Sequence, residues 1–166
     1  MSTLLEKPIS VNRILVTSID HAKAIEDPAR AKIVQMLYNR NLNAEQITLQ
    51  LKKEGHKKAL TTTRHHLDIL KESGLIEIVK IEERRGAITK FYGTSTKLLD
   101  YKTPKDFDQK YSSLIKSTSS KLEKIVNTMS KKTGKTVKPN TKHDFNQYLM
   151  MEIVNRAMTN VLEGKS

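Results

Sequence analysis

The chain has 166 residues, enough for one domain, or for one small domain with a helical extension, that buries a core without disulfide bonds. Its 30 lysines and arginines against 18 acidic residues give a formal charge of +12, which favours a polyanionic partner, either nucleic acid or an anionic membrane. The lack of cysteine excludes disulfides, zinc fingers and thiol-based sensing, and since the chain has neither a signal-peptide core nor an apolar run of the roughly 20 residues that span a membrane, we expect a cytoplasmic protein.

Three helices are expected in the first part of the chain. Residues 11–26 carry apolar side chains near helical spacing and predict the first. A second is expected over residues 28–38, because Asp27 caps well and proline fits the first helical position. Asn43, with Gln46 three residues later, predicts the start of a third helix through a capping box.

The stretch 60–78, LTTTRHHLDILKESGLIEI, carries the clearest functional signal. We expect a helix from an N-cap at Thr61 to Ser73, because Gly74 can adopt the left-handed conformation that ends helices. One stripe of this helix should pack: Thr63, Leu67 and Leu70. His66 lies at the edge of this stripe, where a hydrogen-bonded structural role is favoured over the alternative of a base-reading one. The opposite face should be free, with side chains that can reach phosphates and base edges in a major groove: Thr61, Thr62 and His65, with Arg64 beside them.

After Gly74 the apolar pattern changes to period two and predicts two strands. The first should place Ile76, Ile78 and Lys80 on one face, and the second should contain Ile88, Phe91 and Tyr92. Gly86 allows a tight reversal between them, with Arg84 and Arg85 at the hairpin tip. The basic turn of residues 52–58, KKEGHKK, connects the third helix to the helix after it, so the pattern indicates a helix-turn-helix followed by a wing.

Four short motifs follow one another within residues 19–98: DPAR at 27–30, TRHHLDIL at 63–70, SGLI at 73–76 and FY at 91–92. Together they resemble the winged helix-turn-helix of the ArsR-like transcriptional regulators. The resemblance implies that the helix over 61–73 is the recognition helix and that the hairpin contacts the DNA backbone or minor groove. The chain has Arg64 where that family often has Ser, and it lacks the Cys or paired Asp and His ligands of the metal-sensing members.

Residues after 98 predict two more helices. Over 105–132, apolar residues recur at alternating spacings of four and three, the pattern of a coiled-coil seam with Thr118 as its weak layer. The loop 131–140, KKTGKTVKPN, interrupts it, and Thr141 is expected to cap a last helix with a wide apolar band. The residues expected to form a dimer interface are Tyr111, Ile115, Leu122, Ile125 and Met129.

These patterns predict a mainly α fold with a small β-hairpin: a winged helix-turn-helix DNA-binding domain over 11–98, then a C-terminal helical dimerisation region over 99–166. The function expected is a sequence-specific double-stranded DNA-binding transcriptional regulator that acts as a homodimer. The residues expected to bind DNA are Thr61, Thr62, Arg64, His65, Lys57, Lys58, Arg84 and Arg85.

Blander explanations exist for each of these features. The polar face of the helix over 61–73 could be an ordinary solvated surface. Arg84 and Arg85 could simply form a charged hairpin tip, and the lysines of the 52–58 turn could be ordinary solvated residues. A non-specific architectural DNA or chromatin protein, or a winged-helix protein-interaction module, would show the same fold. The histidines lack a recognisable metal-ligand spacing, and no nucleophile or phosphate loop indicates catalysis, so we expect no enzyme, metal or cofactor. The sequence does not indicate which small-molecule effector, if any, the protein binds.

Overall fold

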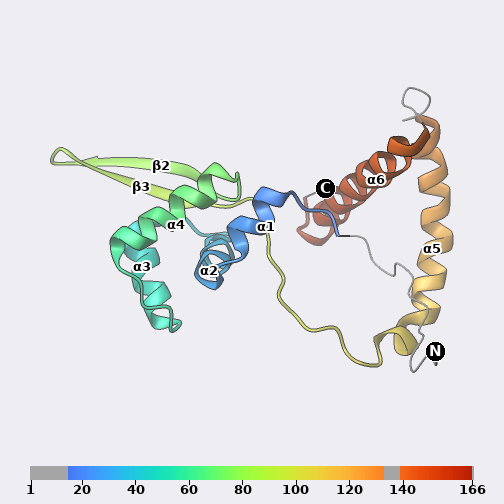
Figure 1. The fold of residues 1–166 in the computed structure, drawn as a ribbon, viewed down its shortest axis with the longest axis horizontal. Helices are drawn as coiled ribbons and strands as arrows, with labels where there is room; N and C mark the ends of the chain where they lie inside the picture. The colour runs from blue at the N-terminus through green and yellow to red at the C-terminus, as the bar shows by residue number, and fades with distance from the viewer. Residues whose placement is uncertain (1–14, 133–138, 166) are drawn as a thin grey trace, which may run out of the picture. The chain divides into compact units, whose positions relative to one another are not determined.

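The computed structural model describes residues 15–132 and 139–165, and the chain divides into two units (Figure 1). One unit spans Thr17–Tyr101, and the helices after it belong to the other. The first unit contains four helices and a small sheet, and the second contains two long helices. The functional roles assigned to residues 11–98 and 99–166 stay predictions.

Helix α1 spans only Ile19–Ile25, so the prediction of a helix over 11–26 is wrong for its described first part, residues 15–18, which have no regular structure. The helix starts later because the Ser18 hydroxyl caps it by accepting a hydrogen bond from the His21 N–H at 3.0 Å. Residues 11–14 lie outside the described part of the chain. Sequence reasoning missed this cap because the apolar spacing continues across it.

Helix α2 spans Pro28–Leu37 and confirms the start signal read at Asp27. The Asp27 Oδ1 accepts hydrogen bonds from the N–H groups of Ala29 at 2.7 Å and Arg30 at 3.4 Å. Helix α3, Ala44–Lys53, begins with the predicted capping box, in which Asn43 and Gln46 each bond the other's backbone N–H at 2.9 Å. Both starts depend only on neighbouring residues, which is why the sequence reveals them.

Helix α4 spans Leu60–Glu72, and the prediction of Thr61 as its N-cap is wrong. Ala59 occupies the cap position without a side-chain hydrogen bond, and its carbonyl accepts from the Thr63 N–H at 2.9 Å. The predicted end is confirmed: Gly74 has a φ of 77°, and the N–H of Leu75 bonds the Leu70 carbonyl at 3.0 Å. This closing pattern is a Schellman motif, which turns the chain directly into the sheet.

The sheet has the order β1-β3-β2 and is antiparallel. Strands β2, Glu77–Arg84, and β3, Ala87–Gly93, form the predicted hairpin, and a short unpredicted strand β1, Leu42–Asn43, pairs with the end of β3. A bulge between Ile78 and Lys80 shifts the register. Ile78 pairs with Tyr92, and Lys80 pairs with the adjacent residue Phe91. Because adjacent residues of a strand point to opposite faces, the expectation that Ile78 and Lys80 share a face is wrong.

Arg85 and Gly86 form the two-residue turn of the hairpin, with φ values of 51° and 80°. Positive φ at both positions is the geometry of a type I′ turn, whose twist matches that of the strands it joins. Gly86 adopts it without steric cost, whereas Arg85 is a residue type that seldom does. Figure 1 shows the hairpin extending past α3 and α4, so its tip has the position of a wing.

The core of the first unit lies between α1–α4 and the base of the sheet. Its largest fully buried side chains come from α2, α3, α4 and the turn into β2: Ile33, Val34, Leu37, Ile47, Leu51, Thr63, Leu67, Leu70 and Ile76. Burial of the apolar side chains among them is the main force that holds the helices together. The arrangement is a mainly α winged helix-turn-helix fold, as the sequence predicts.

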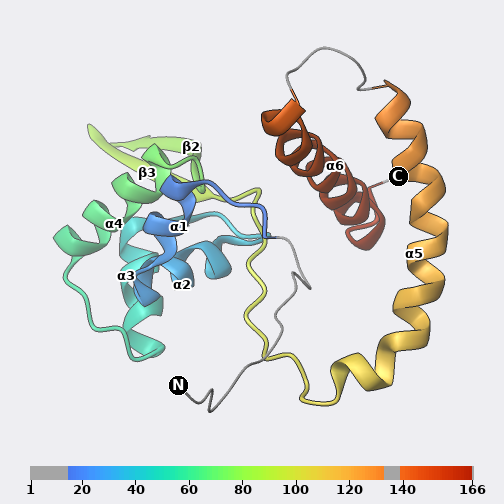
Figure 2. The ribbon, with the colours of Figure 1, turned by 45° about the vertical axis from the view of Figure 1, so that its right-hand side comes forward.

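The described part of the second unit contains α5, Phe107–Lys132, and α6, Pro139–Leu162, which contact each other and run in opposite directions in Figures 1 and 2. Thr141 lies inside α6, so its prediction as the cap is wrong. Proline is tolerated in the first turn of a helix, where its missing N–H would have no partner, so α6 starts at Pro139. Across residues 15–132 and 139–165, no helix combines the length and apolar character needed to cross a membrane.

Candidate nucleic-acid interface

The free face of α4 lies where the sequence predicts it. Thr61, Arg64 and His65 are exposed, and Thr62 is half-buried. The opposite stripe is buried, with Thr63, Leu67 and Leu70 fully enclosed and His66 only 5 % exposed. Because the buried stripe is packed on the core, the backbone that carries the exposed side chains is held rigidly.

A hydroxyl contact joins the two helices of the helix-turn-helix. The Oγ1 atoms of Thr48 on α3 and Thr63 on α4 are 2.9 Å apart. Each hydroxyl also lies within hydrogen-bond distance of a carbonyl one turn earlier in its own chain segment, Ala44 at 2.7 Å and Ala59 at 3.2 Å. The polar groups at this partly buried point therefore satisfy one another, and they fix how the start of α4 sits on α3.

Arg64 makes an ion pair that sequence reasoning missed. Its Nη2 is 3.3 Å from Oε1 of Glu45, which lies in the first turn of α3. In the sequence, Glu45 is recognisable only as an acidic residue near a helix N-terminus. Acidic residues are common at that position because the helix dipole favours them. Its approach to Arg64, 19 residues later, follows from the way α3 and α4 pack.

The predicted phosphate-binding lysines lie in the connection between α3 and α4. Lys57 is exposed and Lys58 is half-buried, directly before the start of α4. Lys52 and Lys53, at the end of α3, are also exposed. These four lysines therefore lie in the same helix-turn-helix as the exposed face of α4, at the end of α3 and in the connection that follows it.

The wing tip carries Arg85, which is exposed in the turn. Arg84 ends β2 opposite Ala87, and its side chain lies outside the described part of the structure. The wing also carries acidic residues: Glu82 forms an ion pair with Lys80, whose Nζ also lies 5.3 Å from the centre of the Phe91 ring. Lys90 in β3 is a second exposed cation of the hairpin, away from the tip.

His66 departs from the expectation of a hydrogen-bonded structural histidine. Both of its ring nitrogens are buried, and neither forms a hydrogen bond with the described residues. Burial lowers the pKa of His66 below its ordinary value, and the positive charges of Arg30 and Lys58 act in the same direction, whereas Asp27 opposes them. The imidazole is therefore neutral at neutral pH and cannot take part in charge-based DNA binding.

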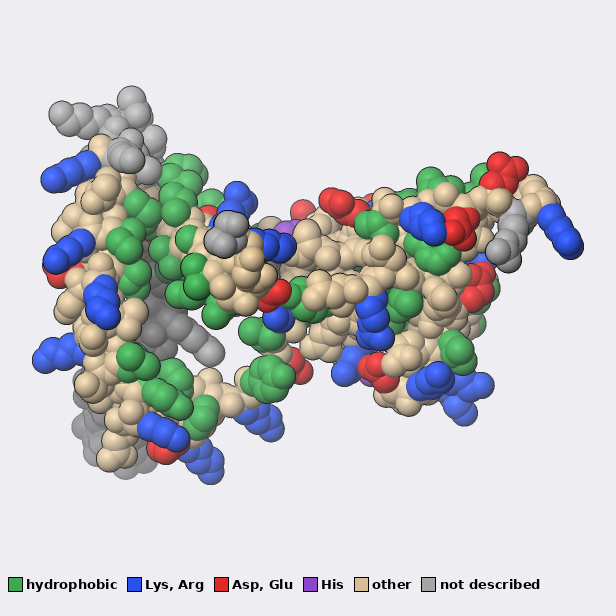
Figure 3. Space-filling model, turned by 180° about the vertical axis from the view of Figure 1, so that it is seen from behind, with side chains coloured by type: hydrophobic (Ala, Val, Ile, Leu, Met, Phe, Trp, Pro, Cys, Tyr) green, Lys and Arg blue, Asp and Glu red, His purple; other side chains and the backbone are tan. Residues whose placement is uncertain are grey.

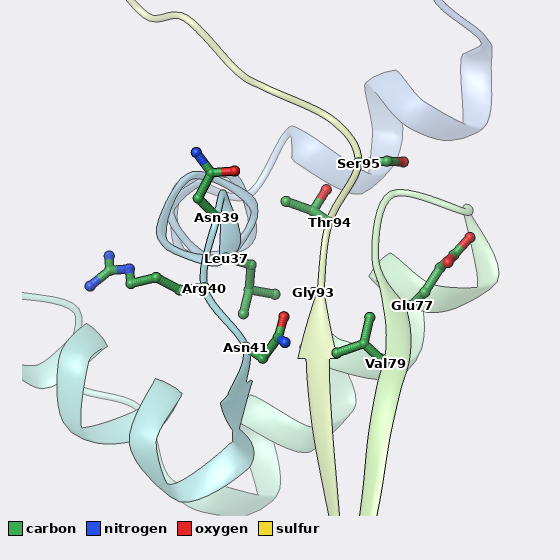
Figure 4. Close-up of a pocket in the computed structure, with 9 residues that line it drawn as sticks. All are labelled: Leu37, Asn39, Arg40, Asn41, Glu77, Val79, Gly93, Thr94 and Ser95. Atoms are coloured by element: carbon green, nitrogen blue, oxygen red, sulfur yellow. The ribbon is translucent and has the colours of Figure 1, made fainter. Parts of the chain in front are cut away.

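A cavity of about 240 Å³ lies at the base of the wing (Figure 4). It is lined by the end of α2, the segment between α2 and β1, the start of β2 and the end of β3. Its side chains do not converge: Arg40 and Glu77 extend to opposite sides, and the Arg40 Nε donates to the Met36 carbonyl at 3.0 Å. Among the described residues, no group of three or more histidines and carboxylates is placed to hold a metal ion. His143 lies outside the described side chains.

The predicted dimer residues lie along one side of α5. Tyr111, Leu122 and Met129 are half-buried, whereas Ile115 is 46 % and Ile125 is 50 % exposed. Figure 3 shows hydrophobic side chains gathered along α5 and α6. On α6 the more exposed large apolar residues are Phe145, Tyr148, Ile153, Met158, Val161 and Leu162.

Comparisons with known proteins add little to this description. No family model matches the chain, and no curated protein matches it either. Among solved structures, HlyU from Vibrio cholerae N16961 is similar, with 22 % identity and a TM-score of 0.37 over 47 % of this chain and 74 % of that one. The transcriptional regulator HlyU from Vibrio vulnificus CMCP6 is 20 % identical, with a TM-score of 0.35 over 47 % of this chain and 71 % of that one. The fold assignment therefore rests on the elements and strand pairing described above.

Proposed function

We propose that the protein is a sequence-specific double-stranded DNA-binding transcriptional regulator that acts as a homodimer. The observation that carries the proposal is the exposed face of α4, where Thr61, Arg64 and His65 project from a helix held by its buried stripe. A helix presented in this way after a turn can enter a major groove, where its first residues reach base edges. The following hairpin would carry Arg85 to the flanking backbone.

The remaining basic residues would position the protein without reading sequence. Lys57 and Lys58 precede α4, so they would meet the phosphates on either side of the groove that α4 enters. Such contacts release condensed counterions and supply affinity for any duplex. In this assignment Arg64 and the threonines supply discrimination, and the lysines and Arg85 supply binding strength.

The second unit would bring two such domains together. One recognition helix covers few base pairs, and regulators of this architecture gain discrimination by placing two helices on half-sites about one helical turn apart. A two-fold symmetric dimer provides that geometry. The seam on α5 and the apolar band on α6 leave large side chains exposed, including Ile115 and Val161, and a second copy of the chain would cover them.

An architectural DNA-binding protein is a second candidate, and the distribution of charge favours it. Residues 17–101 contain 15 lysines and arginines against 11 acidic residues, whereas residues 102–166 contain 13 against 6. The larger excess therefore lies outside the winged-helix unit. Basic helices that make no base-specific contacts bind duplex DNA irrespective of its sequence, as an architectural protein does.

Selection of bound sequences from a pool of random duplex DNA separates the two candidates. A regulator should enrich one motif, with two related half-sites if it binds as a dimer. An architectural protein should retain DNA without enriching a motif. Failure to retain any duplex at low salt would contradict both and would leave a protein-interaction module as the function to test.

A further inference from the structure

The contact between Glu45 and Arg64 is set by the packing beneath it. Thr48 lies three residues after Glu45 on α3, and Thr63 directly precedes Arg64 on α4. The two threonine hydroxyls are 2.9 Å apart, and Thr63 is fully buried. This contact holds the first turns of the two helices at a constant separation, so the charged pair above it follows from the fold.

The ion pair is too exposed to act mainly through folding stability. The side chains of Arg64 and Glu45 are 58 % and 59 % exposed. Exposed pairs contribute little to stability, because water and salt screen the attraction and because ordering two long side chains costs entropy. The consequence of the pair therefore lies in what the Arg64 guanidinium can bind.

A neighbouring carboxylate changes the range of DNA groups that an arginine can bind. The contact uses Nη2 of Arg64 and leaves other N–H donors of the planar guanidinium for a second acceptor. A phosphate brought to Arg64 would also approach the Glu45 carboxylate and be repelled by it. A neutral acceptor, such as O6 or N7 of guanine, meets far less repulsion and can accept from two donors.

The start of α3 is also poorly suited to phosphate. The capping box uses the backbone N–H groups of Asn43 and Gln46 at 2.9 Å each, so these donors are already occupied. Glu45 adds a negative charge where the helix dipole would otherwise attract an anion. This corner of the helix-turn-helix therefore disfavours binding that depends on the DNA backbone alone.

We propose that Glu45 is a specificity-determining residue, which keeps Arg64 from binding phosphates and reserves it for base acceptors in the major groove. The assignment rests on the proposed DNA-binding function and deepens it. It predicts that the carboxylate lowers affinity for random DNA more than affinity for the preferred site. Discrimination, rather than binding strength, is the quantity that Glu45 controls.

Glu45→Gln tests this in the full-length protein, because glutamine keeps the length and hydrogen-bonding capacity of the side chain but removes its charge. Dissociation constants are measured for the motif enriched by the parent protein and for a random duplex at the same salt concentration. We expect affinity for the random duplex to rise about five- to tenfold and affinity for the motif to change less than about twofold, so that discrimination falls about five- to tenfold. Thermal unfolding should be unchanged, which shows that the variant folds.

Two controls isolate the contact from a general change in charge. Glu26→Gln removes the same charge at the exposed end of α1, and discrimination should stay at the parent value. In an Arg64→Ala background, Glu45→Gln should alter discrimination much less, because only the direct repulsion between the carboxylate and phosphate is left to lose.

The outcomes separate this assignment from the function on which it rests. Unchanged discrimination in Glu45→Gln, or an equal fall in the Arg64→Ala background, overturns the role of Glu45 while the regulator proposal stands. A parent protein that enriches no motif overturns the sequence-specific function and this assignment together. An enriched motif with a fall in discrimination that depends on Arg64 supports both.

Discussion

Arg64 and His66 lie two residues apart on α4, and their surroundings give these two basic residue types opposite properties. Arg64 is exposed and paired with Glu45 through Nη2, which leaves other N–H donors of its guanidinium for a ligand. His66 is buried with both ring nitrogens unpaired, so its neutral form is favoured. The step of two residues carries a side chain from the solvent face of a helix to its packed face.

Arg64→Ala should weaken binding to the preferred duplex by about 1–3 kcal/mol and reduce selectivity, because a base contact made by two donors is lost. Random duplex should lose less, because Arg64 makes no matched base contact there. Fluorescence titration of both duplexes measures the two losses. Equal losses would show that Arg64 contacts the backbone and reads no base.

His66→Leu should raise the free energy of unfolding by about 1 kcal/mol at neutral pH, because an imidazole buried without hydrogen bonds is replaced by an apolar side chain. It should also flatten the pH dependence of stability. The folded state lowers the His66 pKa, so the unfolded state binds more protons, and stability should fall as the pH drops below about 6.5.

Urea unfolding at several pH values between about 5 and 8 measures both effects. His65→Gln is the matched control, because the neighbouring imidazole is exposed and its removal should leave the pH dependence in place. A parent protein with constant stability over this range, or a His66→Leu variant that keeps the slope, would contradict the explanation.

At the scale of elements, the wing combines a bulge near its base with a tight turn at its tip. The bulge between Ile78 and Lys80 turns Lys80 to the side of Phe91, where its ammonium group lies over the ring. The turn places Arg85 at a φ of 51°. Since arginine seldom adopts this conformation, Arg85 at this position costs some stability, which is understandable if its charge is needed at the tip.

Arg85→Asn should weaken binding to all duplexes alike and lower the salt slope by about one, because one phosphate contact is lost. Asparagine tolerates positive φ, so the hairpin should be kept or slightly stabilised. Arg85→Lys is the complementary control, which keeps the charge and should bind nearly as the parent does. Parent-like binding by Arg85→Asn would mean that the wing tip does not contact DNA.

At the scale of the whole molecule, a formal charge of +12 predicts that association with duplex DNA depends steeply on ionic strength. We expect the observed binding constant to fall by at least about a hundredfold between about 50 and 200 mM salt, because each neutralised phosphate releases counterions. Binding measured as a function of salt concentration gives the slope directly. An affinity that does not vary with salt would contradict the nucleic-acid function.

The seam on α5 predicts a dimer. Leu122→Lys combined with Ile125→Lys should give a monomer whose winged-helix unit still folds but binds its site far more weakly, since buried charges oppose a coiled-coil contact. Sedimentation at micromolar concentration measures the oligomeric state of both proteins. Ser113→Lys combined with Ser120→Lys adds the same charge at exposed positions away from the seam and should leave the dimer intact.

Two results would contradict this interface. The first is a parent protein that sediments as a monomer. The second is a Leu122→Lys, Ile125→Lys variant that remains dimeric or keeps full affinity. A monomeric parent would indicate that α5 and α6 cover each other within one chain, and a variant that stays dimeric would indicate a dimer interface elsewhere.

The sequence by itself determined the features that depend on neighbouring residues. The starts of α2 and α3 follow from Asp27, Asn43 and Gln46, and the end of α4 follows from Gly74, because caps are bonds between groups a few positions apart. The apolar periods likewise predicted the hairpin and α5. The exposed face of α4 followed from the same helical periodicity.

Only the tertiary structure decided the features that join distant segments. The pairing of β1 with β3, the ion pair between Glu45 and Arg64, and the unpaired nitrogens of His66 each depend on how separate elements pack. A pattern of residue types shows which side of a helix is apolar. It does not show which polar group of another helix will lie opposite a given atom, because that distance is set by the packing of the whole core.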